Sequence, residues 1–109
     1  MPQSEDMLAN IRSTFEHVLA TIEKKNHDYS GDGDPFANAK SALIIGVGVE
    51  RGLLVRILDK LMRVSNLLDH DPRVTEESMR DTLSDAIGYL ALLKAYVEID
   101  HAKQITEVD

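Results

Sequence analysis

Hydrophobic residues recur at helical spacing in four segments of the chain, separated by polar or turn-forming residues. In the first segment Met7, Ile11, Phe15 and Val18 follow one another at intervals of three or four residues, which is the spacing of one helix face. Ser4 precedes this run as a candidate N-cap, and acidic residues follow it in the first turn. The pattern predicts an amphipathic helix over residues 4–25.

Two shorter signals mark the next helices. Asp34 followed by Pro35 is typical of a helix start, and it predicts a short helix that runs to about Ile45. Gly46 and Gly48 then indicate either a break, because glycine weakens a helix, or a close approach of another backbone. A third helix is expected over residues 49–68, and it ends before Pro72.

The third helix carries two apolar stripes rather than one. The first contains Leu54, Ile57, Leu61, Val64 and Leu68, and the second contains Val55, Leu58 and Met62. A helix with two apolar stripes packs on more than one side, inside a bundle or at a subunit interface. This pattern predicts a homo-oligomer, and a two-fold dimer is the commonest form.

The fourth helix is expected over residues 75–102, with Thr75 as its N-cap and glutamates in its first turn. A chain of 109 residues is large enough for one core and one domain, residues 1–109. The sequence therefore predicts an all-α fold, an antiparallel four-helix bundle-like domain with one long polar loop.

Composition and charge narrow the class of function. The net charge of −7 disfavours a nucleic-acid polymer as partner, because phosphate neutralisation requires a basic surface. There is no cysteine, so thiolate chemistry and disulfides are excluded. No apolar run approaches the length of a membrane span, and the acidic N-terminus does not resemble a signal peptide. We therefore expect a cytoplasmic protein (host cytoplasm if the chain is encoded by a phage) that does not bind a membrane.

The polar loop, residues 24–38, has the composition of a binding loop. Lys24 could neutralise a phosphate, Tyr29 could stack on a base, and Asp28 and Asn38 add polar groups. A connection of this length in a small domain is usually functional or disordered. A solvated hinge is the alternative interpretation.

Three carboxylates on the fourth helix form the strongest candidate metal site. Glu77, Asp81 and Asp85 are spaced by four residues, so they share one helix face. Like charges at this spacing repel each other, and a bound cation would remove that repulsion. The alternative is a solvated acidic face, although Asp85 lies too far from the N-terminus for the helix dipole to explain it.

The third helix offers cations beside its apolar stripes. Arg56, Asp59, Lys60 and Arg63 form a polar, mostly cationic strip, in which Asp59 could bind a ligand or simply pair with Arg63. Glu50 is in phase with the first apolar stripe. A carboxylate there is either a helix-end residue at the rim of the core or a metal ligand that faces the fourth helix.

Three blocks of the sequence resemble a known family. They are residues 25–29 with 34–38, residues 50–63, and residues 77–89, which together span roughly Lys24 to Tyr89. In order and spacing the chain resembles the nucleotide-modification-associated helical family of bacteriophages. That family is in turn similar to the MazG-like all-α NTP pyrophosphohydrolases.

The resemblance implies a helical bundle, commonly oligomeric, that handles nucleotides with Mg²⁺ held by carboxylates. Asp81 and Asp85 match the family's paired aspartates, and Glu77 matches the acid one turn earlier. The Asp-Lys-x-x-Arg element of the family matches Asp59, Lys60 and Arg63. The chain departs from the MazG-like pattern because only Glu50 stands where those enzymes carry a Glu-Glu-x-x-Glu motif.

Three functions remain open from the sequence. The first is a magnesium-dependent (deoxy)nucleoside triphosphate pyrophosphohydrolase, with Glu50, Glu77, Asp81 and Asp85 as metal ligands. The second is a phage protein that sequesters a nucleotide signal without turnover. The third is a helical interaction protein with no small ligand.

Overall fold

The computed structural model describes residues 2–30, 36, 39–70 and 72–101, and helices account for nearly all of them. In chain order the elements are α1 (Pro2–Ser30), the 3₁₀ helix η1 (Ala39–Ile45), α2 (Val49–Leu67), α3 (Pro72–Ala95) and the π-helical turn η2 (Tyr96–His101). This described part contains no strand, so the predicted all-α, bundle-like fold is confirmed.

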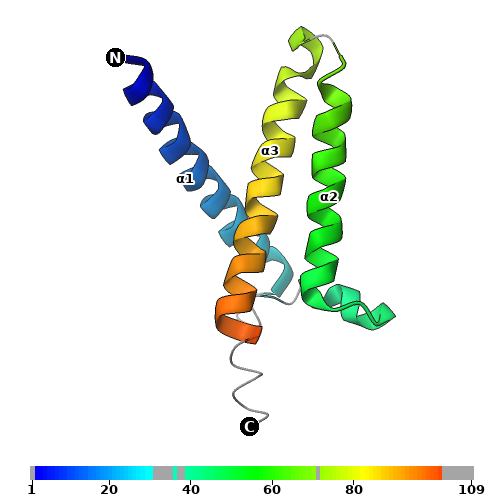
Figure 1. The fold of residues 1–109 in the computed structure, drawn as a ribbon. Coiled ribbons are helices and arrows are strands. Elements are labelled where there is room, and N and C mark those ends of the chain that lie inside the picture. Colours follow the sequence, from blue (N-terminus) through cyan, green and yellow to red (C-terminus); the bar gives the residue numbers. More distant parts are fainter. Residues whose placement is uncertain (1, 31–35, 37–38, 71, 102–109) are drawn as a thin grey trace.

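The helices α2 and α3 form an antiparallel hairpin, and α1 leans against one side of it (Figure 1). The C-terminal half of α1 contacts α3, whereas its N-terminal half diverges from both other helices. At the tip of the hairpin, the amide of Leu68 donates to the carbonyl of Val64 at 3.1 Å and closes α2. The molecule is therefore elongated, with extents of 52 × 30 × 26 Å.

The main core cluster lies at the end of the hairpin where η1 meets α2 and η2. Phe36, Ala39, Val49, Leu53 and Tyr96 are buried together there. The rings of Phe36 and Tyr96 meet edge to face, with centroids 5.6 Å apart, an arrangement that aromatic quadrupoles favour. This cluster anchors the short η1 helix against the start of α2.

The core face of α2 differs from the predicted one. Its buried residues are Val49, Leu53 and Ile57, at intervals of four. Of the two predicted stripes only Ile57 is buried, while Leu54 and Leu61 are 45% and 50% exposed. The pattern contained more apolar positions than one core uses, so their phase alone did not identify the face that packs on α3.

Two predicted boundaries also differ. The helix α1 continues to Ser30 rather than ending near residue 25, because polar residues such as Asn26 and His27 do not break a helix, whereas proline and glycine do. The long loop is accordingly not confirmed. The helix α3 begins at Pro72, so Thr75 lies inside it; Pro is well suited to the first helical position. The break at Gly46 is confirmed by its positive φ of 78°.

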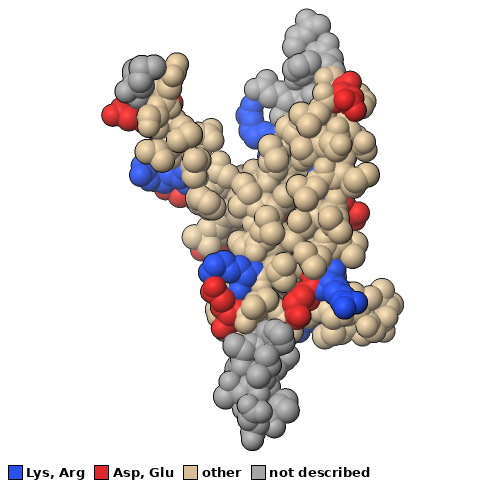
Figure 2. Space-filling view, in the orientation of Figure 1, with Lys and Arg blue, Asp and Glu red and all other residues tan. Residues whose placement is uncertain are grey.

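Charged and uncharged surfaces are unevenly distributed. In the view of Figure 2, uncharged residues cover most of the middle of the α2–α3 hairpin, and many charged side chains gather toward its lower end. None of the described helices is both long and apolar enough to cross a membrane.

Candidate functional site

A pocket of about 320 Å³ lies where the C-terminal half of α1 meets α3. Val18 of α1 approaches α3 at Gly88, where a built Cβ would lie 3.7 Å from Cγ1 of Val18. The cavity lies beside this contact, and Gly88 and Val18 both line it. The side chains that give it chemical character are His17, Thr21, Lys25, Asn26, Arg56, Asp81, Ser84, Asp85 and Tyr89.

One wall of the pocket carries the predicted acidic residues. Asp81 and Asp85 both line it, and so do Gly88 and Leu92 further along the same helix. These positions share one face because they are spaced by three or four residues. The structure thus brings together two of the predicted metal ligands and directs them to a cavity of ligand size.

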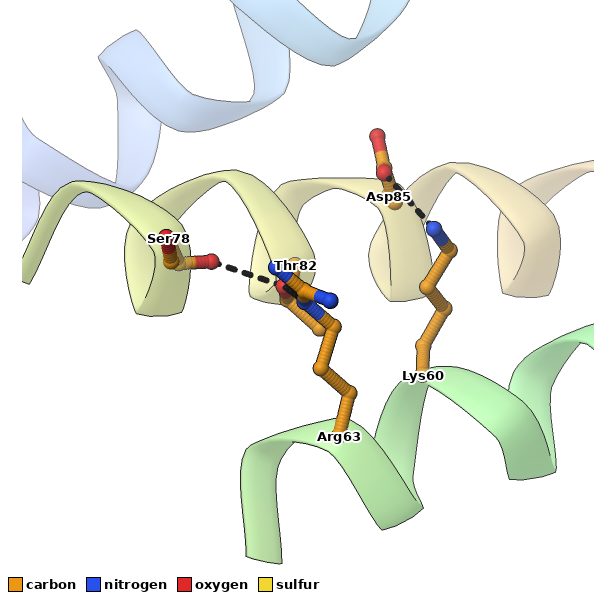
Figure 3. Close-up of polar contacts among 5 residues, drawn as sticks. All are labelled: Lys60, Arg63, Ser78, Thr82 and Asp85. Atoms are coloured by element: carbon orange, nitrogen blue, oxygen red, sulfur yellow. Dashed lines mark hydrogen bonds and ion pairs between the residues drawn. The ribbon is translucent and has the colours of Figure 1, made fainter. Parts of the chain in front are cut away.

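Asp85 already has a cationic partner from the neighbouring helix. The Nζ atom of Lys60 lies 3.1 Å from its Oδ2 atom (Figure 3). Both side chains are partly exposed, at 29% and 41%, so solvent screens their attraction. Lys60 was predicted to neutralise phosphates; in this structure its charge is directed to the acidic wall.

The guanidinium of Arg63 lies one turn further along α2 and contacts a buried hydroxyl. Its Nε donates to Oγ1 of Thr82 at 3.2 Å, and Thr82 in turn donates to the carbonyl of Ser78 at 2.7 Å (Figure 3). Thr82 is only 4% exposed, so both hydrogen bonds satisfy a group that water does not reach. Because a guanidinium has five N–H groups, this contact leaves donors on Arg63 for a ligand.

The predicted cationic strip lines a second, more open hollow of about 530 Å³ between α2 and α3. Arg56, Asp59, Lys60 and Arg63 all border it. Within the described residues Asp59 makes no ion pair with Arg63, which uses its Nε for Thr82 instead. The strip therefore forms one surface, but that surface is not the acidic pocket.

Arg56 and Tyr89 connect the two hollows, because both residues line both of them. The guanidinium carbon of Arg56 lies 5.9 Å from the centroid of the Tyr89 ring, within the range of a cation–π contact. Its Nη2 also donates to Oγ of Ser41 at 3.4 Å. Arg56 is thus held by two elements at the border of the pocket, where a charged group of a ligand could reach it.

Several residues of the pocket were not predicted from the sequence. Lys24 was the predicted phosphate ligand, but the adjacent Lys25 is the lysine that lines the cavity, and both side chains are exposed. His17 is exposed, as expected of a surface residue, and it also borders the cavity, whereas Asn26 and Tyr89 had no predicted role. The signal that could have found Lys25 is its phase, because it follows Val18 by seven residues and so continues the face that contacts α3.

The four predicted metal ligands are not all close together. Glu77 is exposed and outside the residues that line the pocket. Glu50 lies in the first turn of α2, ten residues before Lys60 and hence roughly 15 Å along the helix from the partner of Asp85. Among the described residues no group of three or more acidic or histidine side chains could hold a metal ion. Of the four predicted metal ligands, only Asp81 and Asp85 line the pocket, where they could hold a cation together with a ligand.

Three other predicted residues cannot be placed. The side chains of Asp28 and Tyr29, and the whole of Asn38, lie outside the described part of the structure. Their predicted contacts with a nucleotide base stay predictions.

In comparisons with known proteins, no family model, no curated protein and no solved structure matches this chain. The resemblance to the phage nucleotide-modification-associated and MazG-like families therefore stays a prediction from the sequence.

Proposed function

We propose that this protein binds a nucleotide in the pocket between α1 and α3. The observation that carries the proposal is the composition of that pocket: two carboxylates from α3, an ammonium from α1 and a guanidinium from α2 surround about 320 Å³. This volume falls within the usual range for small-molecule sites. A phosphorylated ligand with bound magnesium requires both kinds of group, because carboxylates coordinate the ion and cationic side chains neutralise the phosphates.

The two carboxylates fit Mg²⁺ in the manner common at phosphate sites. There Mg²⁺ is held by one or two protein carboxylates, and the phosphates and water complete its coordination. Asp81 and Asp85 supply this number from one helix face. When bound, the ion would neutralise phosphate charge and polarise the phosphoryl oxygens.

The remaining side chains have separate tasks in this proposal. Lys25 and Arg56, which approach the cavity from different helices, neutralise the phosphates. A guanidinium is suited to this because its planar fork matches two phosphate oxygens at once. The Tyr89 ring borders the same space and offers an aromatic surface against which a base can stack.

The reaction we propose is hydrolysis of a (deoxy)nucleoside triphosphate between its α and β phosphates. Water adds to the α phosphorus, the bond to the bridging oxygen breaks, and a nucleoside monophosphate and pyrophosphate leave. The resemblance to MazG-like enzymes supports this choice, together with the paired carboxylates Asp81 and Asp85 in the pocket. The protein would act in the cytoplasm, where nucleotides are made and used.

A second candidate function is nucleotide sequestration without turnover. One observation favours it: Lys60 already neutralises Asp85 at 3.1 Å, so the acidic wall does not depend on a metal ion. In that case the cations Lys25 and Arg56 would hold the ligand, and magnesium would be dispensable.

Calorimetry tests both candidates with a panel of NTPs, dNTPs and cyclic dinucleotides, each with magnesium and with EDTA. Pyrophosphate release is measured in parallel. Hydrolysis of any triphosphate that needs magnesium supports the enzyme, whereas binding in EDTA without pyrophosphate supports sequestration. If no nucleotide binds under either condition, both candidates are wrong and the third function, a helical interaction protein with no small ligand, is the one that remains.

Two adjacent lysines provide a matched control for that panel. Lys25→Gln removes a cation that lines the pocket, and Lys24→Gln removes the same charge from the exposed neighbouring position. We expect the first variant to lose about tenfold or more in affinity, because charged hydrogen bonds contribute about 1.5–3 kcal/mol. The second should stay within about twofold of the wild type, because Lys24 does not border the pocket and solvent screens its charge. Equal losses would place the ligand outside this pocket.

A further inference from the structure

One face of α1 changes from covered to bare along the helix. At its C-terminal half, Val18 is 6% exposed and packs at Gly88 of α3. Around and before Val18 lies the α1 apolar stripe, in which every side chain is between 42% and 59% exposed: Met7, Leu8, Ile11, Phe15 and Leu19. A continuous apolar face that a partner helix covers over only part of its length requires a second partner for the rest.

Within the described residues, the N-terminal half of α1 is not covered by another helix. Figure 1 shows it diverging from the α2–α3 hairpin, and the side chains from Gln3 to Ser13 are all exposed. Isolated helices of this length are marginal in water, because helices in proteins are stabilised mainly by packing of an amphipathic face. The N-terminal half of α1 therefore depends on something that covers its stripe.

A second bare surface lies on α2. The α2 apolar face has side chains between 45% and 63% exposed: Leu54, Val55, Leu58, Leu61 and Met62. It is rotated around the helix from the buried positions Val49, Leu53 and Ile57, which contact the rest of the chain. Two large apolar surfaces of this kind on one small chain are rare in monomers.

The dimensions agree with a subunit rather than a complete globule. The radius of gyration is 16.5 Å, whereas a compact domain of this length has about 13 Å. The accessible surface is 8283 Å², whereas a compact monomer of this mass exposes about 6,100 Å². A standard stable interface buries roughly 800 Å² per partner, and the exposed apolar side chains of α1 and α2 are the part of this surface that a partner could cover.

We propose that a second copy of this chain covers the α1 apolar stripe, in a two-fold dimer. A two-fold axis lets each copy offer one apolar surface and receive another, so both the α1 stripe and the α2 face can be covered by the same partner. An anionic membrane fits less well, since the chain carries a net charge of −7 and helices that lie on membranes are usually rich in cations. The interface is independent of the proposed nucleotide site.

Light scattering coupled to size exclusion, from 1 to 100 µM, tests the proposal with two variants. Phe15→Glu places a charge in the α1 stripe, where Phe15 is 59% exposed within its own chain. Ser13→Glu adds the same charge two residues away, on the opposite side of the helix. We expect the wild type and Ser13→Glu to be dimers, with twice the chain mass of 12.2 kDa. We expect Phe15→Glu to be a monomer, with the mass of one chain.

The wild type supplies a second measurement, because the melting temperature of a dimer rises with protein concentration. A wild type that is monomeric with a constant melting temperature overturns the proposal; if it then co-sediments with phosphatidylglycerol vesicles, the stripe binds membranes instead. A dimer that Phe15→Glu leaves intact also overturns it. If circular dichroism shows that Phe15→Glu is unfolded, Phe15→Ala decides: a dimer Kd raised about tenfold or more supports the interface, and an unchanged Kd refutes it.

Discussion

The Nζ atom of Lys60 lies 3.1 Å from Oδ2 of Asp85 and joins the middle of α2 to the acidic wall of the α1–α3 pocket. Asp85 therefore has two possible cationic neighbours, the lysine and an ion bound in the pocket. Because one carboxylate cannot be fully neutralised by both at once, Lys60 and a bound magnesium ion compete for it. This competition makes the pair a direct test of the proposed site.

We predict that Lys60→Met raises the affinity of the protein for magnesium, measured by calorimetry without nucleotide. The reason is that Asp85 loses its internal partner. The free energy of unfolding without magnesium should change by no more than about 1 kcal/mol, because the pair is partly exposed and screened. Lys94→Met is the matched control, since it removes a lysine from the exposed pair with Glu98. Unchanged or weaker magnesium binding in Lys60→Met would contradict the proposed role of Asp85.

Asp81 tests the other half of the acidic wall. It is exposed and lines the pocket. If the proposed site binds magnesium, the ion raises the melting temperature of the wild type, and Asp81→Asn should abolish that rise. Without magnesium the melting temperature should hold or rise slightly, because repulsion from Asp85 one turn away is relieved.

Glu77→Gln is the control for Asp81. Glu77 lies one turn earlier on α3 but does not belong to the residues that line the pocket, so this variant should keep the magnesium response. Thermal melts of the three proteins, with and without magnesium, make the comparison. A magnesium response in Asp81→Asn equal to that of the wild type would rule out the metal site.

The sequence predicted α2 well because strong local signals bracket it. Gly48 precedes its first residue and Pro72 follows shortly after its last, so the expected range of 49–68 differs from the observed Val49–Leu67 by one residue. The end of α1 had no such signal near residue 25. A change from apolar to polar residues marks the end of a buried face, not the end of a helix, which is why the end of α1 was predicted too early.

The site shows the same difference between local and long-range information. The spacing of Glu77, Asp81 and Asp85 predicted a common face, and two of the three, Asp81 and Asp85, line one pocket. The pairing of Lys60 with Asp85, and of Arg63 with Thr82, depends on the register of α2 against α3. The sequence pattern of a single helix does not contain that register. Lys60 and Arg63 could therefore be recognised as candidate binding residues, but their partners on α3 could not be predicted.

Thr82 supports a prediction about stability. Its buried hydroxyl accepts a hydrogen bond from Arg63 and donates one to the carbonyl of Ser78. Thr82→Val keeps the shape but removes both bonds, and it should cost about 1–3 kcal/mol in the free energy of unfolding, because Arg63 loses a partner.

Thr14→Val is the control for Thr82. The hydroxyl of Thr14 donates to the carbonyl four residues earlier, Asn10, at 2.9 Å, and this bond is exposed. The variant should change stability by no more than about 0.5 kcal/mol, since water can replace the bond. Urea unfolding of both variants measures the difference, and equal costs would show that the contact between Arg63 and Thr82 contributes nothing.

Gly88 and Gly46 should respond in opposite directions to the same substitution. Gly88 lies inside α3, and a Cβ there would meet Cγ1 of Val18 at 3.7 Å, an ordinary van der Waals distance. Gly88→Ala should therefore raise stability by about 0.5–1 kcal/mol, the usual gain inside a helix. Gly46 has open space around it but a φ of +78°, so Gly46→Ala should lower stability by about 1 kcal/mol.

The added methyl group at Gly88 also tests the pocket. Because Gly88 lines the cavity between α1 and α3, Gly88→Ala should weaken nucleotide binding even as it raises the melting temperature, whereas Gly46→Ala should leave affinity unchanged in the folded protein. Melting curves and calorimetry on the same samples measure the two effects. If Gly88→Ala is more stable and binds the nucleotide as tightly as the wild type, the ligand does not occupy this pocket, because a methyl group cannot be added to a filled cavity wall without displacing what lies against it.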